Sequence, residues 1–151
     1  MRLSFLLDQN IQEFGEYPFL YYGEKKFTNV ETRAYANQLA IELQRSGIKK
    51  GDRVIVMMPN SPEVLIAYQA ITRAQAVIVP VLFTLHPKEI AYIAENCEAA
   101  RILSSSSIQG QVNQIEKELS TNIPIVMIED LSDLTSPSVR VEENDGMHVP
   151  D

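Results

Sequence analysis

The sequence contains little cysteine, histidine or glycine, and each shortage excludes a class of chemistry. Cys97 is the only cysteine, so the chain cannot close an internal disulfide or build a cysteine-rich zinc site. His86 and His148, the 2 histidines, lie far apart with no partner at metal-ligand spacing. We therefore expect no metal site made by this chain alone.

Glycine and basic charge are also scarce. The 6 glycines are dispersed, and neither G-x-G-x-x-G nor a Walker A phosphate loop occurs. The 13 Lys and Arg against 20 Asp and Glu give a formal net charge of −7, which disfavours nucleic acid and anionic membranes as partners. No apolar run approaches a membrane span, and the N-terminal run is too short for a signal peptide. The sequence favours a cytoplasmic protein.

No side chain combines with its neighbours into an obvious catalytic set. His86 precedes Pro87 where a capping residue is expected, and His148 lies in a polar tail, so neither completes a Ser–His–acid arrangement. Cys97 follows a helical pattern among small residues, which is typical of a buried, unreactive thiol. The serines at 104–107 follow a strand pattern and form either a loop with a spare helix cap or an anion site.

Helical and strand patterns alternate along the chain. Helices are expected after Thr28 up to Gly47, from Pro62, from Pro87 and around Val112–Leu119, and strands at 53–59, 76–83, 100–105 and 123–130. Such alternation builds right-handed βαβ units and a parallel sheet. We predict an α/β fold of three layers, a mostly parallel sheet with flanking helices.

Local signals mark the ends of these elements. Residues 18–28 have β-forming residues on both sides of Gly23 and predict an N-terminal β-hairpin. Thr28 and Glu31 have the spacing of a capping box. Asn60 is expected to make a turn and Ser61 to cap the helix that Pro62 begins.

The apolar runs also predict which residues are buried. Continuous apolar runs at 53–59 and 76–83 are typical of strands buried on both faces. Tyr35, Tyr68 and Tyr92 each lie on an apolar helical stripe and are expected in the core. After residue 130 the chain becomes polar and acidic, so we predict an α/β unit over 1–130 and a linker or tail over 131–151.

The order of short motifs resembles the N-terminal portion of the adenylate-forming enzymes, most closely the acyl-CoA synthetase branch. The resemblance covers roughly residues 3–130. Its motifs are, in order, "FT" (27–28), "AN-LA" (36–40), "GIKKGDRV" (47–54), "PNSPE" (59–63), "AVIVP" (76–80) and "PKEIAYI" (87–93).

The resemblance implies an activity for a longer parent protein. Members of this family join a carboxylic or fatty acid to AMP with Mg-ATP, release pyrophosphate, and pass the acyl group to a thiol such as that of CoA. The family's phosphate loop and catalytic lysine come later in its order and do not occur in these 151 residues. The chain therefore resembles a non-catalytic N-terminal fragment, which would bind no cofactor itself and whose partner is the rest of its parent chain.

The resemblance also suggests ligand contacts and shows departures. Leu82, Phe83 and Thr84 match by position a loop that can approach CoA, and Asn60 and Ser61 match a turn that can lie behind the acyl pocket. Gln75 replaces the family's usual glycine, a change that is tolerated where the backbone is ordinary, and residues 81–83 replace a common L-N-P.

Two other hypotheses remain open from the sequence. The chain is a self-standing, non-enzymatic α/β binding module, or it is a truncated relative that serves as an assembly partner. The second would expose a large apolar patch where the rest of the parent normally packs.

Overall fold

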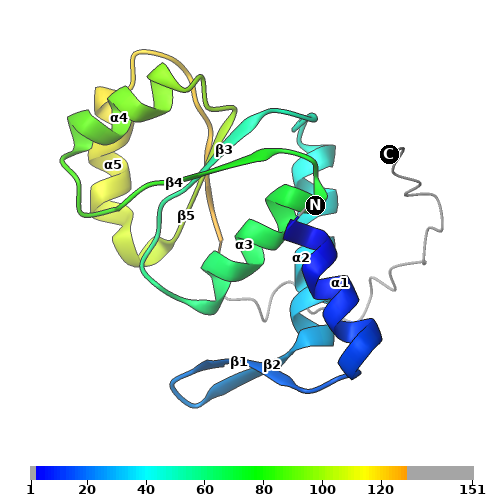
Figure 1. The fold of residues 1–151 in the computed structure, drawn as a ribbon. Helices are drawn as coiled ribbons and strands as arrows, with labels where there is room; N and C mark the ends of the chain where they lie inside the picture. Colours follow the sequence, from blue (N-terminus) through cyan, green and yellow to red (C-terminus); the bar gives the residue numbers. More distant parts are fainter. Residues whose placement is uncertain (1–2, 129–151) are drawn as a thin grey trace.

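The computed structural model describes residues 3–128 (Figure 1). In chain order the elements are α1 (Leu3–Phe14), β1 (Pro18–Tyr22), β2 (Lys25–Thr28), α2 (Asn29–Arg45), β3 (Arg53–Val56), α3 (Pro62–Arg73), β4 (Val77–Pro80), α4 (Pro87–Asn96), β5 (Arg101–Ser104), the 3-10 turn η1 (Ser106–Ile108), α5 (Gln109–Glu118) and β6 (Ile125–Met127). The expected linker at 131–151 lies outside the described residues.

The main sheet has four parallel strands in the order β4-β3-β5-β6. Helices α2 and α3 cover one side of it, which we name the α2/α3 side, and α4 and α5 cover the other, the α4/α5 side (Figure 1). The predicted three-layer α/β fold is therefore confirmed. Among the described helices none is long and apolar enough to cross a membrane.

Each side of the sheet has its own hydrophobic core. Because successive side chains of a strand point to opposite faces, Val54 and Leu103 pack into the α2/α3 cluster, while Ile55 and Ile102 pack into the α4/α5 cluster. Small residues, including Ala36, Ala40, Ala67 and Ala70, are buried in the α2/α3 cluster, which lets these two helices approach closely.

The two apolar runs differ in burial. Val54–Val56 are buried, as predicted for an inner strand. The prediction that the run at 76–83 is also buried on both faces is wrong, because β4 is the edge strand and leaves Val77 and Pro80 exposed. A proline suits this edge, since it has no N–H to offer a further strand.

Helix starts follow the sequence closely. The predicted capping box of α2 is present: the Thr28 hydroxyl accepts from the Glu31 N–H at 3.0 Å, and the Glu31 carboxylate accepts from the Thr28 N–H at 2.8 Å. The expected capping role of His86 is confirmed, since its Nδ1 accepts from the Lys88 N–H at 3.3 Å. Ser61 stands at the cap position of α3, but its side chain makes no capping bond.

Helix ends share one backbone pattern. After α2, α3 and α4 the chain turns through Gly47 (φ +100), Gln75 (φ +62) and Glu98 (φ +52). In α3 the Ala76 N–H donates to the Ile71 carbonyl and the Gln75 N–H to the Thr72 carbonyl, a pair typical of this left-handed ending. The backbone at Gln75 is therefore not ordinary: it has the conformation that glycine adopts without strain.

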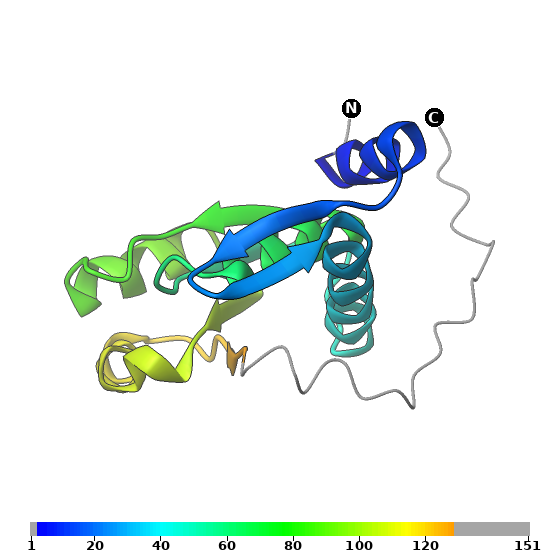
Figure 2. The ribbon, with the colours of Figure 1, turned by 90° about the horizontal axis from the view of Figure 1, so that it is seen from below.

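The N-terminal hairpin is confirmed, with β1 and β2 antiparallel and Gly23 in the left-handed region (φ +57). Helix α1 before it was not predicted. The buried Asn29 side chain joins these parts: its Oδ1 accepts from the Tyr17 N–H at 3.1 Å, and its Nδ2 donates to Asn10 Oδ1 at 3.0 Å and to the Gly15 carbonyl at 2.8 Å. Figure 2 shows the hairpin running along the α3 side of the molecule.

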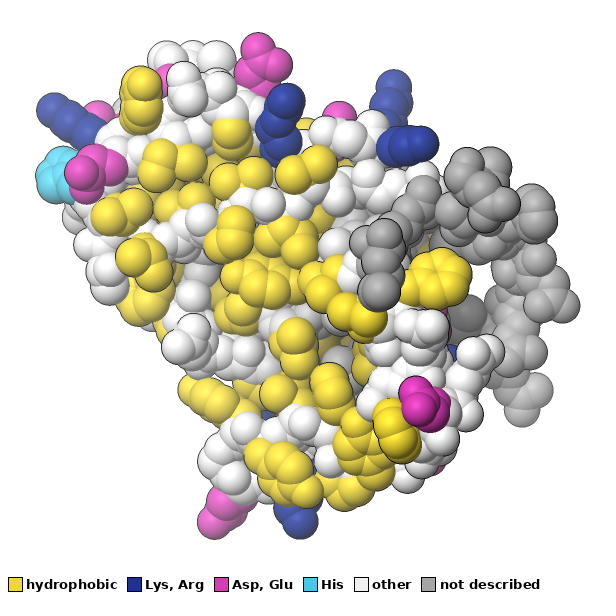
Figure 3. Space-filling view, viewed as in Figure 1, with side chains coloured by type: hydrophobic (Ala, Val, Ile, Leu, Met, Phe, Trp, Pro, Cys, Tyr) yellow, Lys and Arg dark blue, Asp and Glu magenta, His cyan; other side chains and the backbone are white. Residues whose placement is uncertain are grey.

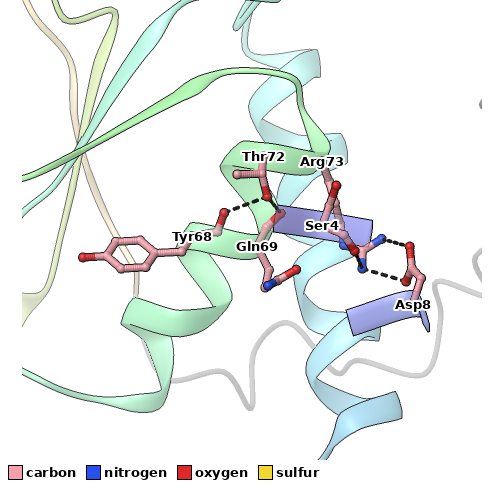
Figure 4. Close-up of polar contacts among 6 residues, drawn as sticks. All are labelled: Ser4, Asp8, Tyr68, Gln69, Thr72 and Arg73. Atoms are coloured by element: carbon pink, nitrogen blue, oxygen red, sulfur yellow. Dashed lines mark hydrogen bonds and ion pairs between the residues drawn. The ribbon is translucent and has the colours of Figure 1, made fainter. Parts of the chain in front are cut away.

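An ion pair holds α1 on α3. The Arg73 guanidinium donates to Asp8 Oδ1 at 2.8 Å and Oδ2 at 3.2 Å, and also to the Ser4 carbonyl at 3.3 Å (Figure 4). The Arg73 side chain is only 11% exposed. This long-range pair and the buried Leu7 side chain connect α1 to the rest of the fold.

Two side chains differ from the sequence expectation. Tyr92 is 68% exposed, so its predicted core position is wrong; Ile90, Ala91 and Ala94 supply the buried face of α4 instead. Tyr35 and Tyr68 do pack against the α2/α3 core. Cys97 is half-buried at the end of α4, and its thiol lies 3.6 Å from the Ala94 carbonyl.

Candidate functional site

The predicted contact residues lie at one edge of the main sheet. Asn60 and Ser61 follow β3, and Leu82, Phe83 and Thr84 follow β4. Because β3 and β4 are neighbouring parallel strands, both loops leave the sheet at its carboxyl edge. This edge is where open α/β sheets bind ligands.

An apolar cavity lies between the hairpin and the start of α3. Its volume is about 280 Å³, and it is lined by Leu20, Tyr22, Asn60, Ser61, Pro62, Val64, Leu65 and Tyr68. The structure therefore places Asn60 and Ser61 at the rim of a hollow whose other walls are mostly hydrocarbon and aromatic. In Figure 1 the hairpin passes below the start of α3.

A second, more polar cavity of about 510 Å³ shares Tyr22, Asn60 and Ser61 with the first. Its further lining residues are Lys25, Pro59, Glu63, Ser105, Ser106, Ser107 and Ile128. The serines that follow β5 thus meet the turn that follows β3. Two of them also hold their own loop: Ser105 Oγ accepts from the Ser107 N–H at 3.3 Å and lies 2.9 Å from Ser107 Oγ.

The loop after β4 lines neither cavity and is fixed from the opposite side of the sheet. Gln111 of α5 donates through Nε2 to the Phe83 carbonyl at 2.9 Å and to the Leu85 carbonyl at 2.8 Å. Phe83 packs against the α4/α5 core, whereas Leu82 is 69% exposed and Thr84 is exposed. The loop therefore presents Leu82 and Thr84 outward on an anchored backbone.

Lys25 and Glu63 are the charged residues that line the polar cavity. No group of three His, Cys, Asp or Glu side chains that could hold a metal ion occurs within residues 3–128. His86 already serves the start of α4. Away from the edge, the pKa of Glu95 lies below its ordinary value because its carboxylate accepts from the Ser120 hydroxyl, the Ser120 N–H and the Thr121 N–H. That group stabilises a turn.

The sequence did not indicate the part that the hairpin plays at this site. Leu20, Tyr22 and Lys25 line the cavities although they precede Asn60 by more than thirty positions in the chain. Their contacts with α3 arise only on folding. The motif order supplied Asn60 and Ser61, and the strand pattern supplied the serines after β5.

Comparison with known proteins identifies the family. The family model described as AMP-binding enzyme matches residues 7–148, so the chain belongs to the AMP-binding enzyme family. The resemblance seen in the motif order is thereby confirmed.

Named relatives are much longer than this chain. A linear gramicidin synthase of Brevibacillus parabrevis is 32% identical over 102 residues, which are 67% of this chain and 1% of that protein. Crotonobetaine/carnitine–CoA ligase of Escherichia coli is 25% identical over 107 residues, 71% of this chain and 21% of that protein. The chain thus spans about a fifth or less of these relatives.

A solved structure shares the fold. The anthranilate CoA ligase AuaEII in complex with anthranoyl-AMP superposes with a TM-score of 0.78 at 22% identity, covering 85% of this chain and 25% of that one. This likeness confirms the arrangement of helices and sheet that the sequence predicted.

Proposed function

We propose that this chain is the N-terminal portion of an ATP-dependent acyl-CoA synthetase. The parent enzyme would join a carboxylic or fatty acid to ATP, giving acyl-AMP and pyrophosphate, and then transfer the acyl group to the sulfur of CoA with release of AMP. The observation that carries the proposal is the family match over residues 7–148, together with the CoA ligases among the relatives.

We further propose that this portion does not catalyse adenylation by itself. The sequence has no glycine-rich phosphate loop. Its described residues form no group of three His, Cys, Asp or Glu side chains that could hold a metal ion, and we assign no step to Mg²⁺ here. Transition-state charge on transferring phosphates needs such preorganised groups.

The site residues fit complementary binding roles in the parent. Thr84 and Leu82 stand outward on the anchored loop after β4 and are proposed to face CoA. Asn60 and Ser61, at the rim of the apolar cavity, are proposed to lie behind the acyl group. Gln111 is a positioning residue for the loop, because its amide holds two carbonyls.

The rest of the parent chain is the proposed partner. Support comes from exposed apolar side chains, which gather over the middle of the face where β4 and α3 lie (Figure 3). Val77 is 47% exposed on the open edge strand. Surfaces of this kind commonly mark an interface.

The test compares this chain with the longer protein encoded by the same gene. Pyrophosphate release is measured for both with a panel of carboxylic acids, and acyl-CoA is measured for the longer protein. We expect no release above the blank from the 151-residue chain, and both products from the longer one. Release by the short chain would overturn its non-catalytic role, and a longer protein that makes no acyl-CoA would overturn the assigned reaction.

The loop assignment has its own test in the longer protein. Thr84→Arg adds bulk and charge where CoA is proposed to pass, so the KM for CoA should rise while pyrophosphate release is unchanged. Thr121→Arg is the matched control, since Thr121 is exposed on the α5–β6 loop. If Thr84→Arg changes pyrophosphate release but leaves the KM for CoA unchanged, the loop after β4 does not contact CoA.

A further inference from the structure

The order of strands creates a distinctive position between β3 and β5. These strands are neighbours in the sheet, yet the helix after β3, α3, lies on the α2/α3 side and the helix after β5, α5, lies on the α4/α5 side. Both strands end at the same edge of the sheet, and the loops that follow them lead to helices on opposite faces. In open α/β sheets a crevice forms at such a switch point, and ligands bind in it.

The polar cavity lies at this point. It is lined by 59–61 from the loop after β3 and by 105–107 from the loop after β5. Its volume of about 510 Å³ is within the range of small-molecule sites. The strand order and the cavity thus each indicate a binding site between the loops after β3 and β5. Neither observation depends on the activity proposed for the parent enzyme.

The two cavities together have an amphipathic lining. The apolar chamber offers Leu20, Val64, Leu65 and the Tyr68 ring, and it adjoins the polar chamber, since Tyr22, Asn60 and Ser61 line both. The Ser61 hydroxyl is not used as a helix cap. A ligand with an apolar tail and a hydrogen-bonding head would match both chambers at once.

The charges of the polar chamber decide the kind of head group. Lys25 and Glu63 both line it and carry opposite charges, so a singly charged head would be attracted by one and repelled by the other. Serine hydroxyls and the Asn60 amide, by contrast, can each donate and accept hydrogen bonds.

We propose that this two-chamber crevice binds an amphipathic molecule with an uncharged, hydroxyl- or amide-bearing head, the tail lying between the hairpin and α3 and the head between the loops after β3 and β5. The proposal goes beyond the ligase function, because such a ligand need be neither the acid nor ATP. It assigns a binding site to this chain by itself.

The experiment uses three probes with one tail: octyl glucoside, octanoate and octylammonium, each kept below its micelle concentration. Calorimetric titration of the 151-residue chain should give the tightest binding for octyl glucoside. Amide NMR shifts should concentrate at 60–61 and 105–107. Equal or tighter binding of either charged probe, or shifts spread over the exposed apolar face, would overturn the proposal.

Paired variants test each chamber. Asn60→Leu removes a polar group that lines both chambers, and Leu65→Asn places a polar group in the apolar chamber. Each variant should bind octyl glucoside about tenfold more weakly, which is the loss expected for one hydrogen bond or for exposing the tail to one polar group. Asn96→Leu, an exposed position on α4, is the matched control and should bind as the unchanged chain does. Thermal unfolding without ligand confirms that each variant is folded. If Leu65→Asn fails to fold, Asn60→Leu decides, and unchanged binding there would overturn the site.

Discussion

The two sides of the sheet each have a buried core but are closed to different degrees. On the α4/α5 side, polar side chains tie the loops down: Gln111 holds the loop after β4, and Glu95 holds the turn before β6. On the α2/α3 side, further elements are added: α1 is paired to α3, and the hairpin lies near the start of α3 with a cavity between them.

The two sides therefore suit different roles. The α4/α5 side packs against the strands without a cavity among those described, whereas the carboxyl edge on the α2/α3 side has cavities lined by aromatic and polar side chains. A site needs rigid support together with an accessible surface. We expect substitutions of buried side chains to lower stability by similar amounts on the two sides. Substitutions of side chains that attach α1 or the hairpin should have effects that differ from those on the α4/α5 side.

The largest effect should come from truncating the core on each side. Leu103 and Ile102 are adjacent on β5, are both fully buried, and point to opposite sides. Leu103→Ala and Ile102→Ala should each lower the free energy of unfolding by about 2–5 kcal/mol in urea titrations. Val126→Ala, at a position 39% exposed, is the control with a small effect. A loss for Ile102→Ala as small as the control's would mean that the α4/α5 side is not an independent core.

A smaller effect should follow removal of the ion pair that holds α1. Asp8→Asn leaves the mostly buried Arg73 guanidinium without its countercharge. The free energy of unfolding should fall by about 1–2 kcal/mol, a value between those typical of breaking an exposed and a buried ion pair. Hydrogen exchange should quicken in α1 and stay unchanged in β3. Glu13→Gln on the same helix, an exposed position, is the matched control. Unchanged exchange in α1 would show that apolar contacts alone hold it.

The helix ends offer one substitution on each side. Gln75 after α3 and Glu98 after α4 have φ values of +62 and +52, where glycine has no side-chain penalty. Gln75→Gly and Glu98→Gly should therefore each stabilise the chain, by about 0.5–1 kcal/mol in urea titrations. Gly47→Ala, at φ +100, should have the opposite sign. Destabilisation by both glycines would indicate that these side chains make contacts that outweigh the backbone strain.

The smallest effect should be the pH dependence at Glu95. Hydrogen bonds from Ser120 and Thr121 lower the pKa of its carboxyl below the ordinary value in the folded state. Its contribution to stability is therefore complete above the unfolded pKa and is lost as the pH falls through the lower folded value. Unfolding curves of the unchanged chain and of Glu95→Gln should differ near neutral pH and converge on acidification. A constant difference at every pH would assign the effect to packing instead of charge.

Local signals accounted for most elements because their causes are local. The capping box at Thr28, the cap at His86 and the turn at Gly23 each depend on residues close in sequence. Buried strands were found where apolar runs were continuous. The pattern could not tell an inner strand from an edge strand, however, so the exposure of β4 was missed: burial depends on what lies beside a strand.

The candidate site was predictable only in part, for the same reason. Motif order pointed to Asn60 and Ser61, but the hairpin residues that complete both cavities lie far earlier in the chain. The packing of α1 on α3 was missed because the Asp8–Arg73 pair joins positions that no short-range pattern connects.

The sequence by itself determined the family, the alternation of strands and helices, and the positions of the helix caps, because these depend on neighbours along the chain. Only the tertiary structure decided which strand lies at the edge, where the hairpin and α1 pack, and that the loops after β3 and β5 share a crevice. Those properties arise from side chains distant in sequence, whose contacts form when the layers pack together.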